Sequence, residues 1–188
     1  MRFEKKIYGL TVNMRTIEEF DAEVTYKMRS DPEKSRYIHR AEGTVEDQRK
    51  YIAQQQNKPD DYLFVIEDKS GNAIGMRGVY NFNPSENSVE TGRFICMGTP
   101  LQSIESFCLG FDFAFDYLKV DKVIMSALET NTNMKNMQKR FGATPYLVIY
   151  NEEFGCDSVY SEILKKDYPL LRRNAMKIVQ RFANRPNK

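Results

Sequence analysis

Tryptophan is absent from this 188-residue sequence, and histidine and cysteine are scarce. The three cysteines, Cys96, Cys108 and Cys156, are odd in number and far apart, so we expect no disulfide and a cytoplasmic, reducing environment. The single histidine, His39, leaves too few ligands for a zinc centre, and we expect no metal site.

Several signatures of common protein classes are also missing. The sequence has no Gly-x-Gly-x-x-Gly, no Walker loop and no Gly-x-Ser-x-Gly elbow, which argues against dinucleotide enzymes, P-loop NTPases and serine hydrolases. No run approaches the roughly 18 apolar residues of a membrane span, and residues 1–6 lack the apolar core of a signal peptide. The formal net charge of +2 is too small to indicate a general nucleic-acid or membrane surface.

The residues that are present are those of a globular protein. Hydrophobic residues make up 41% of the chain and aromatic residues 12%, enough to build a packed core. The length suits one domain, and no linker or repeat divides it, so we expect residues 1–188 to form a single domain.

Apolar periodicity predicts a mixed α/β protein. Alternation predicts a strand over residues 7–15, and the capping box Thr16-x-x-Glu19 predicts a helix over residues 17–28 with Phe20 facing inward. The elements expected after these are a helix from Thr44 to Gln56, a three-strand meander over 62–67, 73–81 and 89–97, a long helix from Ser103 to Leu118, a strand over 122–128, a helix over 133–140, strands over 146–150 and 158–164, and a basic helix over 171–188.

One junction is a candidate ligand site. The expected strand over 89–97 is followed by the break at residues 98–102 and then by the long helix. Free backbone amides at a helix start can cradle an anion such as a diphosphate, although an ordinary strand–helix turn gives the same pattern. Glu105, expected in the first turn, would oppose an anion there.

The order of elements and several phrases resemble the GNAT superfamily of acetyl-CoA-dependent N-acetyltransferases. The nearest branch is that of ribosomal-protein N-terminal and amino-sugar acetyltransferases. The phrases that carry the likeness are Met14-Arg15-Thr16 with Asp21, residues 26–32, 64–67, 73–75, Val89-Glu90-Thr91-Gly92-Arg93, residues 113–118, and Asn131 eleven residues before Gly142. The resemblance implies a central, mostly antiparallel sheet with one parallel crossover pair, flanked by helices.

The resemblance also implies a place for acetyl-CoA as co-substrate. Its pantetheine arm would pair with Ile95, Cys96 and Met97, and Asn131 matches the asparagine that contacts the coenzyme. The diphosphate would lie on the loop after that strand, with contacts from Gly98, Thr99, Leu101, Gln102 and Ser103.

Two positions depart from the family pattern. The glycine-rich phosphate loop is replaced by residues 98–103, which resembles some amino-sugar acetyltransferases. Gln138 stands where many members have a tyrosine that protonates the leaving thiolate. The loss is tolerable, because a CoA thiol with a pKa near that of cysteine, about 8.5, leaves readily as thiolate.

The resemblance makes Glu90 the candidate general base, which would deprotonate the amine directly or through water. Two alternatives to a catalytic role for Glu90 have equal weight, a solvent-facing position on the strand and an ion pair with Arg93. Candidates for acceptor binding are His39, Arg40, Arg77 and Tyr80, of which the first three also fit ordinary surface positions.

The function expected is transfer of acetyl to a primary amine, with a nucleotide-linked amino sugar as the first candidate acceptor. A ribosomal-protein-like N-terminal acetyltransferase is the alternative within the enzyme class. A non-catalytic GNAT module that binds acyl-CoA or a partner is the third interpretation. Either a monomer or a homodimer fits.

Overall fold

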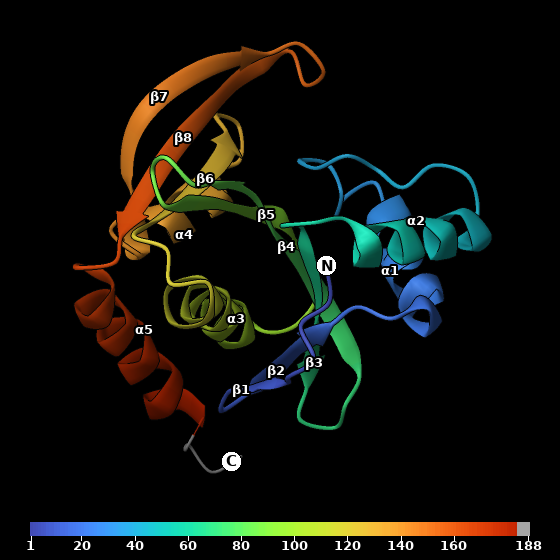
Figure 1. Cartoon of the computed structure of the whole chain (residues 1–188), viewed down its shortest axis with the longest axis horizontal. Helices are drawn as coiled ribbons and strands as arrows, with labels where there is room; N and C mark the ends of the chain where they lie inside the picture. The colour runs from blue at the N-terminus through green and yellow to red at the C-terminus, as the bar shows by residue number, and fades with distance from the viewer. Residues whose placement is uncertain (184–188) are drawn as a thin grey trace.

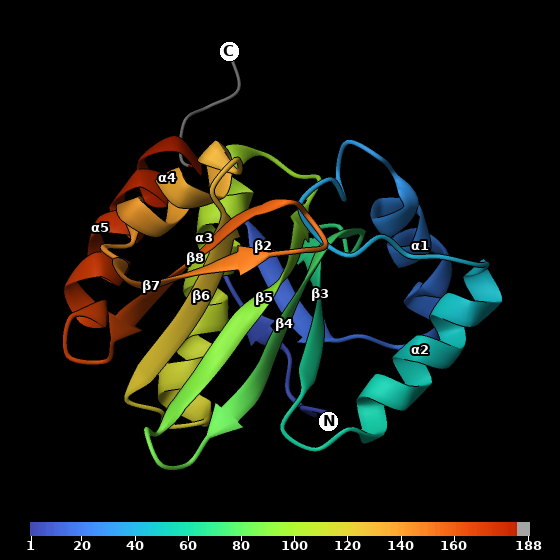
Figure 2. The same ribbon diagram turned by 90° about the horizontal axis from the view of Figure 1, so that it is seen from above.

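One eight-stranded sheet organises the computed structural model, which describes residues 1–183. The strands lie in the order β1-β2-β3-β4-β5-β6-β8-β7, and every neighbouring pair is antiparallel except β5 and β6, which are parallel. Helices α1 and α2 cover one face of the sheet, whereas α3, α4 and α5 cover the other (Figures 1 and 2). The mixed sheet with one parallel crossover pair confirms the expected fold class.

The elements follow the expected order with adjusted bounds. The strands are β1 (Ile7–Tyr8), β2 (Val12–Thr16), β3 (Tyr62–Asp68), β4 (Ala73–Asn83), β5 (Ser88–Cys96), β6 (Lys122–Leu128), β7 (Thr144–Asn151) and β8 (Cys156–Leu164). The helices are α1 (Ala22–Ser30), α2 (Val45–Asn57), α3 (Pro100–Asp112), α4 (Thr132–Arg140) and α5 (Tyr168–Ala183), with short helical turns η1 (Glu19–Asp21) and η2 (Phe113–Tyr117).

The N-terminal region differs from the prediction. The single strand expected over residues 7–15 is a hairpin of β1 and β2, because the chain turns between them and Gly9 N donates to Val12 O. The capping box is formed by Glu18 and Asp21, so a helical turn precedes α1. Phe20 is consequently 72% exposed rather than inward.

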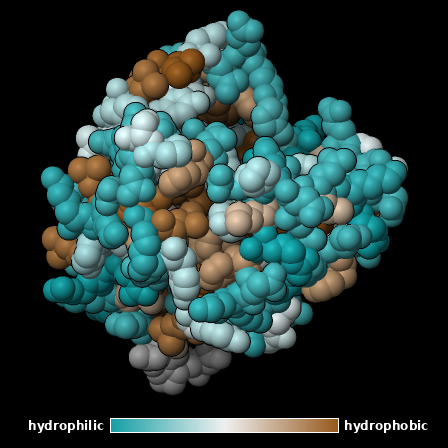
Figure 3. Space-filling view, in the orientation of Figure 1, coloured by the Kyte–Doolittle hydropathy of each residue, from teal (hydrophilic) through white to brown (hydrophobic). Residues whose placement is uncertain are grey.

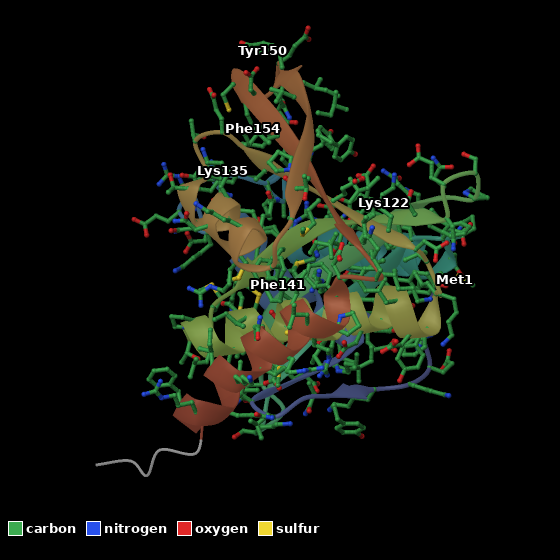
Figure 4. The ribbon with its side chains drawn as sticks, turned by 90° about the vertical axis from the view of Figure 1, so that its left-hand side faces the viewer. Met1, Lys122, Lys135, Phe141, Tyr150 and Phe154 are labelled. Carbon is green, nitrogen blue, oxygen red and sulfur yellow. The ribbon has the colours of Figure 1, made fainter. Side chains whose placement is uncertain are left out.

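Aromatic side chains fill the core between the sheet and α3. Phe107, Phe111 and Phe141 are in mutual ring contact, as the apolar stripe of the long helix predicts. Figure 4 shows Phe141 in the interior beside α4 and α5. Helix α3 is thereby fixed against β5, the strand that carries the candidate site.

The C-terminal helix docks on α3 through a buried polar contact. Nε and Nη2 of Arg172 donate to the carboxylate of Asp112, which also accepts from the hydroxyl of Tyr168. Arg172 belongs to the helix expected to be basic, and it reaches back to α3 because Tyr168 anchors the start of α5. Residues 184–188 of the expected helix lie outside the described part of the chain.

Strand β7 ends the sheet and is unusually apolar at its surface. Five consecutive residues, 146–150, are each between 43% and 61% exposed. The space-filling view shows a hydrophobic patch over this strand, separate from the apolar side chains visible at the centre of the same face (Figure 3).

Candidate active site

The sheet opens between β5 and β6. These strands pair only where Ser88–Thr91 lies beside Lys122–Met125. Beyond Thr91, β5 continues along β4 to Cys96, whereas β6 continues along β8 to Leu128. Arg93 has a positive φ of 51°, and the β4–β5 register shifts between the pairs Gly78–Gly92 and Met76–Ile95, which enclose it. This irregularity turns β5 away from β6 and leaves two strand edges facing each other.

A cavity of about 580 Å³ occupies the opening. Its walls come from both sides of the sheet, from α1 and the loop after it to α3 and α4. The residues that line it are Arg29, Lys34, Tyr37, Ile38, His39, Tyr51, Arg77, Tyr80, residues 91–94, Phe107, residues 125–128, Asn131, Met134, Gln138, Asn151, Phe154 and Ser158. The cavity therefore passes through the sheet, and a donor and an acceptor could meet in it from opposite faces.

The loop after α1 closes the cavity on one side. The hydroxyl of Tyr37 donates to Thr130 O over 3.2 Å, across the opening. Nδ1 of His39 lies 2.7 Å from Oε1 of Glu153, and its ring contacts Phe154 edge-on. Phe154 belongs to the turn of the β7–β8 hairpin, which extends beyond the body of the molecule (Figure 4). Two distant segments thus make a roof over the site.

One wall of the cavity is cationic and aromatic. The guanidinium of Arg93 donates to both carboxylate oxygens of buried Asp61 and lies 4.2 Å from the ring centroid of Tyr80. The guanidinium of Arg29 lies 5.2 Å from the ring centroid of Tyr51. Burial raises the pKa of Tyr80 to about 12, so its phenol is neutral at physiological pH.

Arg77 is buried beneath the opening rather than on the surface. Only 1% exposed, it donates from Nη1 to Ser106 O and from Nη2 to Oγ1 of Thr91. Burial lowers its pKa to about 10, and the described residues provide no carboxylate partner. The side chain fits because Gly110 of α3 has no Cβ, which would lie 2.0 Å from Nη1. The surface interpretation of Arg77 was wrong.

The expected diphosphate loop is closed by its own side chains. Thr99 N–H donates to Oε1 of Gln102, and Gln102 N–H donates to Oγ1 of Thr99. Ser103 N–H donates to Thr99 O, and Pro100 has no N–H. The amides of Gly98 and Leu101 are those left for a ligand in the present conformation. None of residues 95–103 lines the cavity.

Glu105 does not oppose an anion at that loop. Helix α3 begins at Pro100, earlier than predicted, and the Glu105 side chain points instead to the β1–β2 turn. Its carboxylate accepts from the backbone N–H groups of Leu10, Thr11 and Val12 and from the hydroxyl of Thr11. The expectation about Glu105 was wrong, because a fully buried carboxylate needs these donors.

Helix α4 contributes two amide side chains to the cavity. Asn131 caps the helix, with Oδ1 accepting from Met134 N–H. Gln138, 4% exposed, accepts from the hydroxyl of Ser161 over 3.4 Å, and its Nε2 has no hydrogen-bond partner in the described chain.

Glu90 lies just outside the cavity. It is half-buried on β5, opposite Tyr80 in register, and precedes the irregular segment by two residues. It makes no ion pair with Arg93, which binds Asp61 instead. Glu86, in the turn between β4 and β5, pairs with Lys122.

The structure brings together four of the predicted site residues, His39, Arg77, Tyr80 and Asn131. Arg40 is exposed and does not line the cavity. Sequence reasoning missed Arg29, Tyr51 and Phe154, which come from three separate segments. No motif joins them. The packing of α1 on α2 places Arg29 over the ring of Tyr51, and Phe154 reaches the cavity from the β7–β8 turn.

Within residues 1–183, no cluster of three or more histidine, cysteine or acidic residues could hold a metal ion. No helix in that range has the length and hydrophobicity to cross a membrane.

Comparisons with known proteins agree with this geometry. Residues 11–144 match the family model described as "Acetyltransferase (GNAT) domain". No curated protein sequence matches significantly. Among solved structures, a GCN5-related N-acetyltransferase from Brucella melitensis is similar with a TM-score of 0.81 and 14% identity, over 94% of this chain and 86% of that one.

Two further similar structures are of proteins with a named substrate class. Apo FdhC, described as a nucleotide-linked sugar GNAT, has a TM-score of 0.78 and 20% identity, over 95% of this chain and 99% of that one. Spermidine N-acetyltransferase from Vibrio cholerae, in complex with CoA and spermine, has a TM-score of 0.76 and 17% identity, over 85% of this chain and 98% of that one.

Proposed function

The chain belongs to the GNAT acetyltransferase family, and from that premise we propose that it acetylates the primary amine of a nucleotide-linked amino sugar. The family supplies the reaction, an acetyl transfer from acetyl-CoA to an amine. The observation that carries the choice of acceptor is the charge of the cavity wall.

Four arginine and lysine residues line the cavity, and no aspartate or glutamate from the described chain lines it. Arg29 and Lys34 make no ion pair with any carboxylate of residues 1–183. A guanidinium and an ammonium suit phosphate oxygens, the first as a planar fork and the second as a point charge. The same wall would repel a polyamine, whose recognition needs carboxylates.

The shape of the cavity supports a small acceptor. Its volume of about 580 Å³ is in the range of small-molecule sites. Tyr37, Tyr51 and Phe154 offer aromatic faces to a sugar or a base. The roof made by His39 and Glu153 favours a compact ligand over the extended N-terminus of a protein, which remains the second candidate.

The opening between β5 and β6 also fits the coenzyme. The strand edges left unpaired beyond Thr91 fit an extended pantetheine arm, and Asn131 borders that space. We propose that Ile95, Cys96 and Met97 offer their backbone to it. A diphosphate fits residues 98–103 through the amides of Gly98 and Leu101, and through Thr99 once the Gln102 side chain moves.

Glu90 is the proposed base. Because it lies outside the cavity but beside Tyr80, it would accept the amine proton through a water molecule. The neutral phenol of Tyr80 can donate a hydrogen bond to that water or to the acceptor.

The test is a panel of acceptors with acetyl-CoA, comprising nucleotide-linked amino sugars, polyamines and N-terminal peptides. We expect acetylation of a nucleotide-linked amino sugar, weakened by Arg29→Gln and unaffected by Arg173→Gln, a change at an exposed arginine of α5 that does not line the cavity. Glu90→Gln should lower kcat about 100-fold and preserve coenzyme binding, whereas Glu86→Gln should leave both kcat and coenzyme binding unchanged. Acetylation confined to polyamines or peptides would contradict the proposal.

A further inference from the structure

Two buried donors in the cavity wall have nothing to donate to. Nε2 of Gln138 and Nε of Arg77 are buried and have no hydrogen-bond partner in the described chain. Both residues line the cavity. Buried donors are nearly always paired, so an unpaired donor that borders a cavity indicates a bound acceptor.

The surroundings of Gln138 fix the direction of its amide. The residue is 4% exposed near the end of α4, and Oε1 accepts from the hydroxyl of Ser161 on β8. Because the amide oxygen already accepts a hydrogen bond from Ser161, the NH₂ group is the part of the amide that can bind a ligand in the cavity. The neighbouring cavity residues on α4, Asn131 and Met134, are uncharged.

We propose that Nε2 of Gln138 donates a hydrogen bond to the sulfur of CoA and stabilises it as a thiolate when the acetyl group leaves. The inference rests on the proposed acetyl transfer. In that step the amine nitrogen bonds to the acetyl carbon, the carbon–sulfur bond breaks, and its electron pair stays on sulfur. The amine proton goes to Glu90 or water, and Gln138 keeps its own proton.

A hydrogen bond is sufficient for this task. A thiol has a pKa of about 8.5, so its thiolate needs little stabilisation near neutral pH. An amide cannot act as an acid there, but a hydrogen bond to a charged acceptor is about twice as strong as one to a neutral acceptor. The side chain therefore does by hydrogen bonding what a tyrosine at this position would do by proton transfer.

The other charged groups at the cavity act in the same direction. Arg77 faces it from β4, Arg93 from β5, and Arg29 and Lys34 from α1 and its loop, where His39 lies beside Glu153. Their contribution is common to all variants at position 138, so a comparison of variants isolates the amide.

The experiment measures the thiol pKa of enzyme-bound CoA by thiolate absorbance, in wild type, Gln138→Leu and Gln138→Met. Gln54→Leu, at an exposed position of α2 away from the cavity, is the control. We expect the bound thiol pKa to rise by about one unit in both position-138 variants, and kcat to fall about tenfold with little change in the KM for acetyl-CoA. The control should match wild type.

Two results would overturn the inference. If the variants bind CoA and its thiol pKa is unchanged, Gln138 does not contact the sulfur, even where activity falls. If neither they nor the wild type bind CoA, the proposed function fails as well. Gln138→Tyr adds a check. A phenol at this position should restore the turnover that Gln138→Leu and Gln138→Met lose, and it should add an alkaline limb to the pH profile of kcat.

Discussion

Arg77 and Thr91 are joined at the point where the sheet opens. Nη2 of Arg77 donates to Oγ1 of Thr91 over 2.5 Å, and Thr91 is the last residue of β5 that pairs with β6. Nη1 of Arg77 donates a hydrogen bond to the carbonyl of Ser106 on α3. One buried side chain therefore ties β4, β5 and α3 together beside the cavity.

Arg77→Met should impair function more than stability. The lowered pKa of Arg77 means that the fold disfavours its charge, a penalty of roughly 3 kcal/mol that is present below pH 10 and relieved as pH rises from there toward 12.5. Methionine removes this penalty together with the hydrogen bonds. Urea unfolding at pH 7 should change by about 1 kcal/mol or less, while kcat/KM falls at least about tenfold. A large loss of stability would show that Arg77 is structural only.

Glu105→Gln should destabilise the fold. The carboxylate accepts from three backbone N–H groups and a hydroxyl at the β1–β2 turn, and an amide NH₂ in place of one oxygen would face these donors. We expect a loss of about 2 kcal/mol in the free energy of unfolding. Exposed Glu42→Gln is the control, and an equal effect of the two changes would contradict this role.

Gln102→Ala tests the loop expected to hold the coenzyme diphosphate. In the wild type, Thr99 N–H donates to Gln102 Oε1, so the change frees this N–H. The cap of α3 by the Thr99 hydroxyl stays in place. Acetyl-CoA should then bind a few-fold more tightly in isothermal titration, because no side chain has to be displaced. A clear loss of affinity would show instead that the Gln102 side chain itself contacts the coenzyme.

Tyr80 should not titrate in the working range. Burial disfavours the phenolate and raises the pKa to about 12, even though Arg93 lies over the ring and favours it. Tyr80→Phe should therefore keep every limb of the pH–rate profile between pH 6 and 10 and lower the rate without shifting it. Disappearance of an alkaline limb in the variant would make Tyr80 a general acid or base.

The order of elements could be predicted because apolar periodicity in this chain is strong. The stripe that contains Phe107 and Phe111 specifies α3, and Gly142, with a φ of +64°, ends the region of α4 as expected. The start of α1 could not be placed, since Thr16 and Glu18 both fit a capping residue and only tertiary contacts decide between them.

The site was less accessible from the sequence. Arg77 reads as a surface residue because its burial depends on Gly110, 33 positions away and without a Cβ. An ion pair of Arg93 with nearby Glu90 was one alternative, but the partner of Arg93 is Asp61, from the segment before β3. Long-range electrostatic partners of this kind are set by topology, which local pattern does not encode.

The most direct test of the account is isothermal titration of acetyl-CoA against wild type, Ser126→Trp and Ser70→Trp. Ser126 is exposed on β6 and lines the opening, so an indole there would fill the space assigned to the pantetheine arm, whereas Ser70 lies in an exposed turn. We predict micromolar binding to wild type and to Ser70→Trp, and none to Ser126→Trp. Unaltered binding to Ser126→Trp, or no binding to wild type at millimolar coenzyme, would contradict a coenzyme site between β5 and β6.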